Sequence, residues 1–343
     1  MSSNFYDIVI VGSGPVGLNA AIEAKRQGLS ALVLDKGVLC DAIYNWPTHI
    51  RFFTTAKLLE IGGHPFPSTD VKPTRQRALD YYRGVAENEQ LNVLQHHRVV
   101  DITRNDHDFT ISGEKTLKGK SEAFEFHASN VIVAIGYFDN PNGLGGVPGE
   151  DKPLVSYYFD EPHPYYDHDV VIIGAGNSGA ETALALWRHG AHVTVVHKYA
   201  EPKESIKYWL RTDFVNRLKE GSITPVMSAD TKKIVDDGVI VDTPDEKDKF
   251  IPADQVFILT GYEPDVSLLQ HWGMEINPED KSVKKDDNTH ETTNPGMYVV
   301  GSCGAGQNTS TIFIENGRIE AVEAVQAIAN HRNSINQRKE LLN

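Results

Sequence analysis

The sequence predicts an α/β fold made of two three-layer domains, one inserted into the other. The first observation is a motif that occurs twice, as VIVGSGPVGLNAAIEAKRQGLSALVLDKG at residues 9–37 and as VVIIGAGNSGAETALALWRHGAHVTVVHK at residues 170–198. The second is a short run of β-branched residues before each glycine cluster, which is typical of strands buried on both faces. The third is the length of 343 residues, which is enough for about two domains.

The first copy predicts a Rossmann-like nucleotide site. Its run YDIVIVG indicates a strand, LNAAIEAKRQG indicates a helix, and Gly12, Gly14 and Gly17 lie between them in G-x-G-x-x-G spacing. The first glycine permits a tight turn, the second lets the backbone approach a diphosphate, and the third allows close packing of helix on strand. The helix N-terminus offers free N–H groups to the phosphate. The next strand ends at Asp35, where a carboxylate accepts both ribose hydroxyls.

The second copy predicts a nucleotide site that ends in basic residues, where the first copy ends in an acidic one. The strand HDVVIIG is followed by Gly174, Gly176 and Gly179, and the strand AHVTVVHK then ends at His197 and Lys198. Basic groups at this place suit a 2′-phosphate, so the copy predicts NADP rather than NAD. A solvated basic turn after a strand is the alternative. Asp35 at the end of the first copy therefore predicts FAD in the first site, and His197 and Lys198 at the end of the second copy predict NADPH in the second site.

Composition excludes several classes of function. The net charge of −14 argues against a nucleic-acid partner, because phosphate binding needs clustered Lys and Arg. No run approaches the roughly 20 apolar residues that a membrane span needs, and the N-terminus lacks a basic leader, so the cytoplasm is expected. The two cysteines, Cys40 and Cys303, are too few for a disulfide framework or a cysteine-only zinc site, and no metal site is predicted.

Further stretches resemble the thioredoxin-reductase-like flavoproteins that bind two dinucleotides. Among these, the chain most resembles the YpdA family, called bacillithiol disulfide reductases. The stretches are IYNWPTHIRFFTTAKLLEIGG, RALDYYRGV, GVPGEDKP, HPYYDHDVVIIG, SIKYW, LTGYEPD and IFIENGR. The resemblance implies FAD, NADPH, a homo-oligomer, and hydride transfer from NADPH to FAD and then to a small disulfide or other acceptor.

The same resemblance implies how the domains are joined. The runs NVIVAIGYFDNPN and FILTGYEPD resemble the two connectors of such flavoproteins. The FAD domain then takes residues 1–150 and 278–343, and the NADPH domain takes residues 151–277. TTNPGMYVVGSCGAG resembles the segment in which an Asp contacts the flavin ribityl chain, with Ser302 in its place here. The helix after it is expected to present its first N–H groups, near Thr311, to the flavin.

The predicted site consists of residues from both motifs, the connector, the block from residue 43 to residue 57 and the C-terminal segment. The expected cofactor-binding residues are Gly12, Gly14, Pro15, Gly17, Asp35, Lys36, Asn45, Thr48, Ala134, Gly136, Gly174, Gly176, Asn177, Ser178, His197, Lys198, Gly301, Ser302 and Thr311. The chemistry is expected to centre on the flavin, so the catalytic side chains stay open, with Cys303 as the candidate redox thiol.

The sequence departs from the pattern that it resembles at two places. There is no CxxC before the second glycine motif, and Val16 stands where bacillithiol disulfide reductases often have a cysteine. Valine cannot attack a disulfide, so either the flavin reduces the acceptor directly or Cys303 is the redox thiol. Three alternatives need no cysteine: a ferredoxin- or flavodoxin–NADP reductase-like enzyme, a flavin monooxygenase, and a non-enzymatic nicotinamide-sensing flavoprotein.

Overall fold

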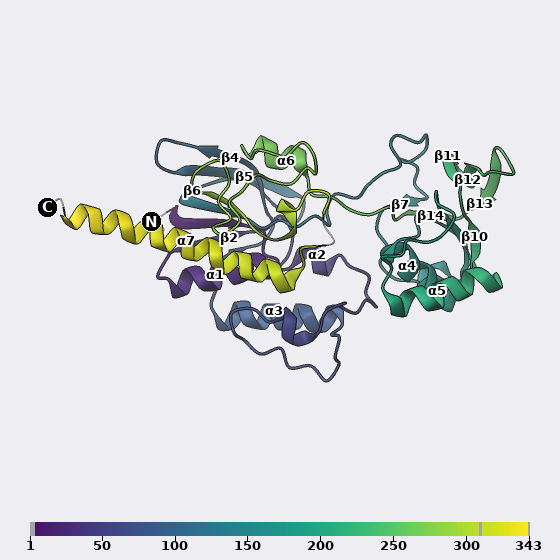
Figure 1. Cartoon of the computed structure of the whole chain (residues 1–343), viewed down its shortest axis with the longest axis horizontal. Helices are drawn as coiled ribbons and strands as arrows, with labels where there is room; N and C mark the ends of the chain where they lie inside the picture. Colours follow the sequence, from purple (N-terminus) through teal and green to yellow (C-terminus); the bar gives the residue numbers. More distant parts are fainter. Residues whose placement is uncertain (1–3, 309–310, 342–343) are drawn as a thin grey trace. The chain divides into compact units, whose positions relative to one another are not determined.

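The chain forms two compact units, which are shown in a computed structural model that describes residues 4–308 and 311–341 (Figure 1). Unit 1 comprises Met1–Asn140 and Glu263–Asn343, and unit 2 comprises Pro141–Tyr262. Both predicted boundaries, 150/151 and 277/278, lie later in the chain than the observed ones. The reason is a pairing between the connectors: Pro141 forms a β-bridge with Tyr262, so both connecting segments leave unit 1 at the same point.

Unit 1 is built on a seven-stranded sheet with the order β3-β2-β1-β6-β5-β4, and β15 also pairs with β6. Strand β1 is parallel to β2 and β6, while β5 is antiparallel to β4 and β6. The strands are β1 (Phe5–Val11), β2 (Ala31–Leu34), β3 (Val93–Leu94), β4 (His97–Arg104), β5 (Phe109–Leu117), β6 (Lys120–Val133) and β15 (Met297–Val299).

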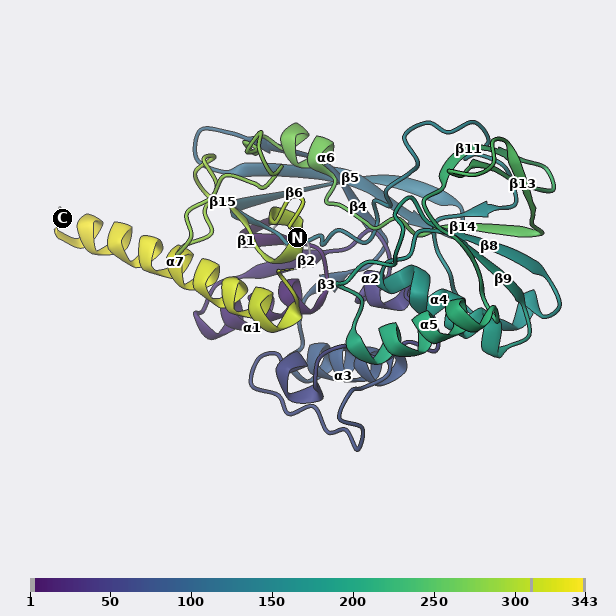
Figure 2. The same cartoon turned by 45° about the vertical axis from the view of Figure 1, so that its right-hand side comes forward.

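Alternate residues of β1 face two different layers of unit 1. Ile8 and Ile10 belong to a core shared with helices α1 and α7, whereas Val9 and Val11 belong to a core shared with β4 and β5. This period of two is what a strand buried on both faces requires. Figure 2 shows α1 and α7 beside each other. The helical segments are α1 (Pro15–Arg26), α2 (Asp41–Tyr44), η1 (Ala56–Leu59), α3 (Arg75–Asn88), α6 (Val266–His271), η3 (Gly301–Gly304) and α7 (Ile314–Leu341).

Unit 2 repeats this plan on a smaller parallel sheet with the order β10-β9-β8-β14-β7. Val170 and Ile172 of β8 pack with α4, while Val171 and Ile173 pack with the separate antiparallel sheet β11-β12-β13. The elements are β7 (Val155–Ser156), η2 (His163–Tyr165), β8 (Asp169–Ile173), α4 (Asn177–Arg188), β9 (His192–Val196), α5 (Tyr208–Glu220), β10 (Thr224–Val226), β11 (Asp230–Val235), β12 (Gly238–Asp242), β13 (Lys249–Pro252) and β14 (Gln255–Ile258). Both units are therefore layered α/β structures, as predicted.

Across residues 4–308 and 311–341, no helix has the length and apolarity to cross a membrane. The same described residues contain no group of three or more His, Cys, Asp and Glu side chains that could hold a metal ion.

Candidate functional site

The first glycine turn joins β1 to α1 and leaves a space in front of the helix. A Cβ on Gly12, whose φ is +109°, would lie 2.5 Å from the carbonyl oxygen of Ala134, and one on Gly17 would lie 2.0 Å from the oxygen of Gly12. Those two positions therefore require glycine. A Cβ on Gly14 would meet no described atom within 4 Å. The open space at Gly14 and the unpaired N–H groups of α1 fit a diphosphate.

Asp35, which directly follows β2, is 8% exposed, and its carboxylate accepts hydrogen bonds from neighbouring residues of the protein. Its Oδ2 accepts hydrogen bonds from the main-chain N–H of Ser13 at 2.6 Å and from the Ser13 hydroxyl at 2.7 Å, and Oδ1 accepts one from Gly37 at 3.0 Å. Burial raises the pKa of Asp35 and these hydrogen bonds oppose the rise. A carboxylate has about four acceptor positions, so Asp35 has room for one further donor rather than for two ribose hydroxyls.

Three distant segments converge beside this turn. Ser302 places its Oγ 4.0 Å from the Cβ position of Gly136, which follows β6 and has a φ of +69°. The methyl groups of Val16 in α1 lie 3.4 Å from the Cβ position of Gly301, which follows β15. The first turn of α1, the connector after β6 and the turn after β15 are thus assembled at the carboxyl edge of the sheet, where nucleotides bind in such folds.

The block from residue 43 to residue 57 also reaches this edge. The ring of Trp46 lies 6.4 Å from that of Phe138 in the connector, measured between centroids. Asn45 follows α2 and donates from Nδ2 to Asp41 at 3.0 Å, and Thr48 lies in an exposed turn.

The predicted start of the last helix is wrong by one turn. Helix α7 begins at Ile314, and Thr311 precedes it in a turn where its hydroxyl donates to the carbonyl oxygen of Asn308 at 2.7 Å. Asn316 accounts for the shift, because its Oδ1 accepts from the main-chain N–H of Phe313 at 2.6 Å and its Nδ2 donates to the Thr311 carbonyl at 2.8 Å. These bonds hold the chain in a turn before the helix begins.

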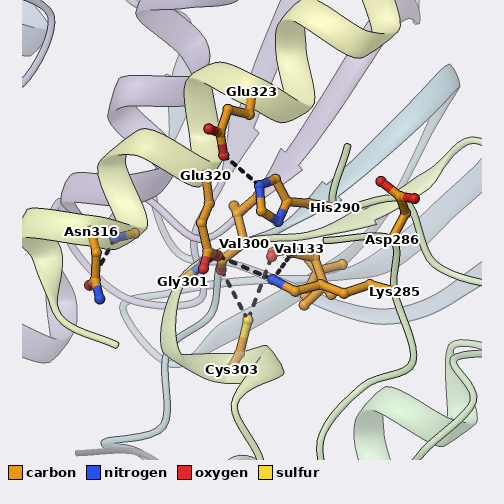
Figure 3. Close-up of polar contacts among 12 residues, drawn as sticks. Val133, Lys285, Asp286, His290, Val300, Gly301, Cys303, Asn316, Glu320 and Glu323 are labelled. Carbon is orange, nitrogen blue, oxygen red and sulfur yellow. Dashed lines mark hydrogen bonds and ion pairs between the residues drawn. The ribbon is translucent and has the colours of Figure 1, made fainter. Parts of the chain in front are cut away.

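Figure 3 shows Cys303 below the turn that follows β15. The thiol is 1% exposed and lies 3.5 Å from the carbonyl oxygen of Val133 and 3.4 Å from that of Val300. Burial raises its pKa to about 11. Cys40 is also 1% exposed, and burial raises its pKa well above the ordinary value. Both thiols are therefore protonated at neutral pH and out of reach of solvent, which is the environment of an unreactive cysteine.

A partly buried ion pair supports the same turn from α7. Glu320 Oε2 accepts from the main-chain N–H of Gly301 at 2.8 Å and lies 3.2 Å from Nζ of Lys285 (Figure 3). The two side chains are 17% and 14% exposed. Glu320 thus fixes the left-handed residue at which the chain leaves β15.

The second glycine turn repeats the geometry of the first. A Cβ on Gly174 would lie 2.4 Å from the carbonyl oxygen of Leu259, and one on Gly179 would lie 2.0 Å from that of Gly174. The Cβ position of Gly176 is open except for Cδ of Lys203 at 3.9 Å. This turn also fits a diphosphate, and here a lysine side chain lies beside it.

His197 occupies the place of Asp35 in the second copy. Its Nδ1 accepts a hydrogen bond from the main-chain N–H of Ala175 at 3.3 Å, which places the ring proton on Nε2. That Nε2 is buried and has no hydrogen-bond partner among the described residues. Burial lowers the pKa of His197, with help from Lys203 and Lys198, so the imidazole is neutral. The ring offers one N–H donor, and Lys198, which is exposed, carries the positive charge predicted for this site.

The basic loop after β9 is tied to the N-terminus of α4. Asn177 donates from Nδ2 to the carbonyl oxygen of Ser205 at 3.3 Å and accepts at Oδ1 from the main-chain N–H of Lys207 at 2.9 Å. The main-chain N–H of Lys203 donates to Ala175 at 3.1 Å. Asn177 is therefore a loop anchor, while the next residue of the first turn, Ser178, is exposed.

Sequence reasoning missed Ser13 and Glu181. Glu181 lies in the second turn of α4, where desolvation raises its pKa from 4.5 to about 7. Polar residues are ordinary on a helix, so no pattern in the sequence distinguishes this carboxyl group. Ser13 lies inside the glycine motif, and the G-x-G-x-x-G pattern leaves its residue type open.

Comparison with known proteins decides the family. The family model described as pyridine nucleotide-disulphide oxidoreductase matches residues 9–301. The chain belongs to this family. Bacilliredoxin reductase Bdr of Bacillus subtilis is 38% identical over 326 residues, which cover 95% of this chain and 98% of that protein. The solved structure of bacillithiol disulfide reductase Bdr (YpdA) from Bacillus cereus matches with a TM-score of 0.92 and 37% identity, covering 95% of this chain and 99% of that one.

A more distant relative is the ferredoxin–NADP reductase of Ignicoccus hospitalis. It is 26% identical over 331 residues, which cover 94% of this chain and 98% of that protein. The predicted resemblance to the YpdA family and the predicted fold class are confirmed. As a pyridine nucleotide-disulphide oxidoreductase, this chain is an FAD-dependent oxidoreductase that uses NADPH.

Proposed function

We propose that this oxidoreductase uses NADPH to reduce a small disulfide, with FAD held by unit 1 and NADPH by unit 2. One NADPH, one proton and one disulfide give NADP⁺ and two thiols, so two electrons break one S–S bond. When bound, the two cofactors supply the hydride chemistry. The single observation that carries the proposal is the pair of glycine turns, one ending in a carboxylate and the other in His197 and Lys198.

Each glycine turn binds one cofactor through its own set of residues. In unit 1, the space at Gly14 takes the FAD diphosphate, and the free acceptor position of Asp35 takes a ribose hydroxyl. In unit 2, the space at Gly176 takes the NADPH diphosphate, Nε2–H of His197 donates to the adenosine ribose or its phosphate, and Lys198 pairs with the 2′-phosphate.

The buried thiols favour direct reduction of the acceptor by the flavin. Cys40 and Cys303 are the chain's only cysteines, both are buried, and burial raises the pKa of each. Neither suits attack on a disulfide, which needs an accessible thiolate. The relatives named for bacillithiol disulfide favour a low-molecular-weight substrate. We also propose, from the same relationship, a homo-oligomer that acts in the cytoplasm.

Steady-state NADPH oxidation by the FAD-loaded protein tests the proposal. The panel contains bacillithiol disulfide, glutathione disulfide, cystine, ferredoxin, flavodoxin and oxygen, and thiol formation is measured beside NADPH loss. We expect two thiols for each NADPH with one of the disulfides. No thiol from any disulfide, with NADPH still consumed by another acceptor, would overturn the substrate assignment.

A second candidate is transfer of electrons to ferredoxin or flavodoxin. It is favoured by the absence of an accessible thiol and by the similarity to ferredoxin–NADP reductases. Turnover with ferredoxin or flavodoxin and none with disulfides would establish it. Flavin reduction by NADPH without turnover of any acceptor would instead support a nicotinamide-sensing flavoprotein.

A further inference from the structure

An ion pair connects two loops that flank the first glycine turn. Nζ of Lys36 lies 2.9 Å from Oδ2 of Asp139, and the two side chains are 46% and 38% exposed. Lys36 directly follows Asp35 at the end of β2, and Asp139 lies in the connector after β6. The two residues are far apart in the sequence, so only the fold brings them together.

The sheet order places this pair across the turn. Strand β1 lies between β2 and β6 and is parallel to both, and the registers align Leu34, Val11 and Val133 in one row. All three strands therefore end at the same edge. Neighbouring strands are about 4.8 Å apart, so β2 and β6 are separated by roughly 10 Å, with residues 12–14 emerging between them. The Lys36–Asp139 contact joins the two loops that leave this edge on either side of β1.

Main-chain hydrogen bonds fix the backbone on both sides of Lys36. The main-chain N–H of Asp35 donates to Leu94 at 3.0 Å, and the N–H of His97 donates to the carbonyl oxygen of Asp35 at 2.7 Å. The N–H of His96 donates to Gly37 at 2.8 Å. The chain is thus pinned on both sides of Lys36.

The Asp139 side is pinned as well. Phe138 packs against Trp46, and the main-chain N–H of Glu263 donates to the carbonyl oxygen of Asn140 at 3.1 Å. Because both ends of the span are held by main-chain contacts or aromatic packing, the two charged side chains are its movable part. An exposed ion pair contributes little to stability, so it opens at small cost.

The two glycine turns suggest what the lysine does. In the second turn, Lys203 lies beside the diphosphate space, with its Cδ 3.9 Å from the Cβ position of Gly176. In the first turn, no described lysine atom lies within 4 Å of the Cβ position of Gly14. Lys36 supplies a cation at the corresponding edge of the sheet, from the end of β2.

We propose that Lys36 and Asp139 form a clasp over the glycine turn at residues 12–14, and that Lys36 exchanges Asp139 for the diphosphate of the dinucleotide. Asp139 is then a positioning residue that holds the ammonium group over an empty turn and competes with the phosphate for it. The inference rests on the proposed FAD site; it gives Lys36, one of the expected cofactor-binding residues, a specific ligand group and adds Asp139 as its competitor. It explains why an acidic side chain lies beside a site for an anion, where it would otherwise only repel the ligand.

Two substitutions with opposite expected effects test the clasp. FAD is removed, and the dissociation constant of added FAD is measured by quenching of flavin fluorescence. Lys36→Met should weaken binding about three- to tenfold, because an ammonium–phosphate contact is lost and Asp139 stays charged. Asp139→Asn should tighten binding about threefold, because the lysine is released and a repulsive charge is removed. In the Lys36→Met background most of the gain from Asp139→Asn should disappear.

A control variant and a salt series complete the design. Asp80→Asn breaks the exposed Arg83–Asp80 pair on α3, which is 2.8 Å long, and makes the same change in net charge. It should leave FAD binding unchanged. Binding by Lys36→Met should also depend less on salt than binding by the wild type, since one phosphate contact is missing.

The outcomes separate the clasp from the proposed function. Equal weakening by Lys36→Met and Asp139→Asn would show a merely structural pair and overturn the inference. Tight FAD binding that neither substitution changes would also overturn the clasp while leaving the FAD site intact. Failure of the wild type and of Asp80→Asn to bind FAD, with normal thermal unfolding, would overturn the FAD site and the clasp together.

Discussion

The main-chain N–H of Ala175 donates to Nδ1 of His197, as the main-chain N–H of Ser13 donates to Oδ2 of Asp35 in the first copy of the motif. The same backbone geometry therefore presents a carboxylate in one turn and a neutral imidazole in the other. Ser13 adds a second bond through its hydroxyl, whereas the alanine in the second copy cannot. The residue after the first glycine thus helps to decide how much of the strand-end side chain remains for a ligand.

Substitution of Gly14 should abolish FAD binding without disturbing the fold. The Cβ position of Gly14 meets no described atom within 4 Å, so Gly14→Val obstructs the ligand and not the protein. We expect the variant to be purified colourless with an unchanged circular dichroism spectrum. Gly84→Val is the matched control, because the Cβ position of Gly84 in α3 is also open, and that variant should remain yellow. A yellow Gly14→Val protein would contradict the proposed site.

The enzyme should prefer NADPH, and Lys198→Glu should erase or reverse the preference. A charge-assisted contact with the 2′-phosphate contributes about 1.5–3 kcal/mol, which is roughly ten- to a hundredfold in binding. The measurement is kcat/KM for NADPH and NADH. Lys219→Glu changes the charge equally at an exposed site in α5 and should keep the preference. Equal use of both nucleotides by the wild type would refute the assignment of His197 and Lys198.

Glu181 should make stability depend on pH. Burial raises its pKa from 4.5 to about 7, so the folded protein binds the proton more tightly than the unfolded chain. The free energy of unfolding should therefore fall as the pH rises from about 4.5 to about 7 and stay reduced above that range, by about 3 kcal/mol. Glu181→Gln, which cannot ionise, should be more stable than the wild type at pH 8 and similar to it at pH 4.

Urea unfolding followed by circular dichroism at the two pH values measures this difference. Glu201→Gln removes an exposed carboxyl group of unit 2 and serves as the control. The assignment fails if Glu181→Gln gives the same stability change at both pH values.

Removal of both cysteines should leave disulfide turnover unchanged. Cys40 and Cys303 are buried, and burial raises the pKa of Cys303 to about 11, so almost no thiolate exists at pH 7.5. We expect the double variant Cys40→Ala, Cys303→Ala to retain FAD and to oxidise NADPH with a disulfide at the wild-type rate. If turnover collapses in Cys303→Ala alone, while NADPH still reduces the flavin, then Cys303 is the redox thiol.

The sequence by itself determined the α/β class, the two glycine turns and the residue that follows each second strand. These features are local: strand and helix periodicity and the steric need for glycine depend on residues close in the chain. Gly12 and Gly174 show this, because both adopt a positive φ where the motif predicts a tight turn. The start of α7 was predicted less well, since the side-chain bonds of Asn316 postpone it.

Only the tertiary structure decided how the charged and thiol groups are used. The pairing of Lys36 with Asp139 joins the loops after two strands that flank a third. The bonds from Ser13 and Gly37 to Asp35 fill most of a carboxylate that the motif predicts to be free. The domain boundary likewise depends on Pro141 meeting Tyr262. The physical reason is that burial and ion pairing are properties of neighbours from distant segments, and no local pattern in the chain records which neighbours the fold will supply.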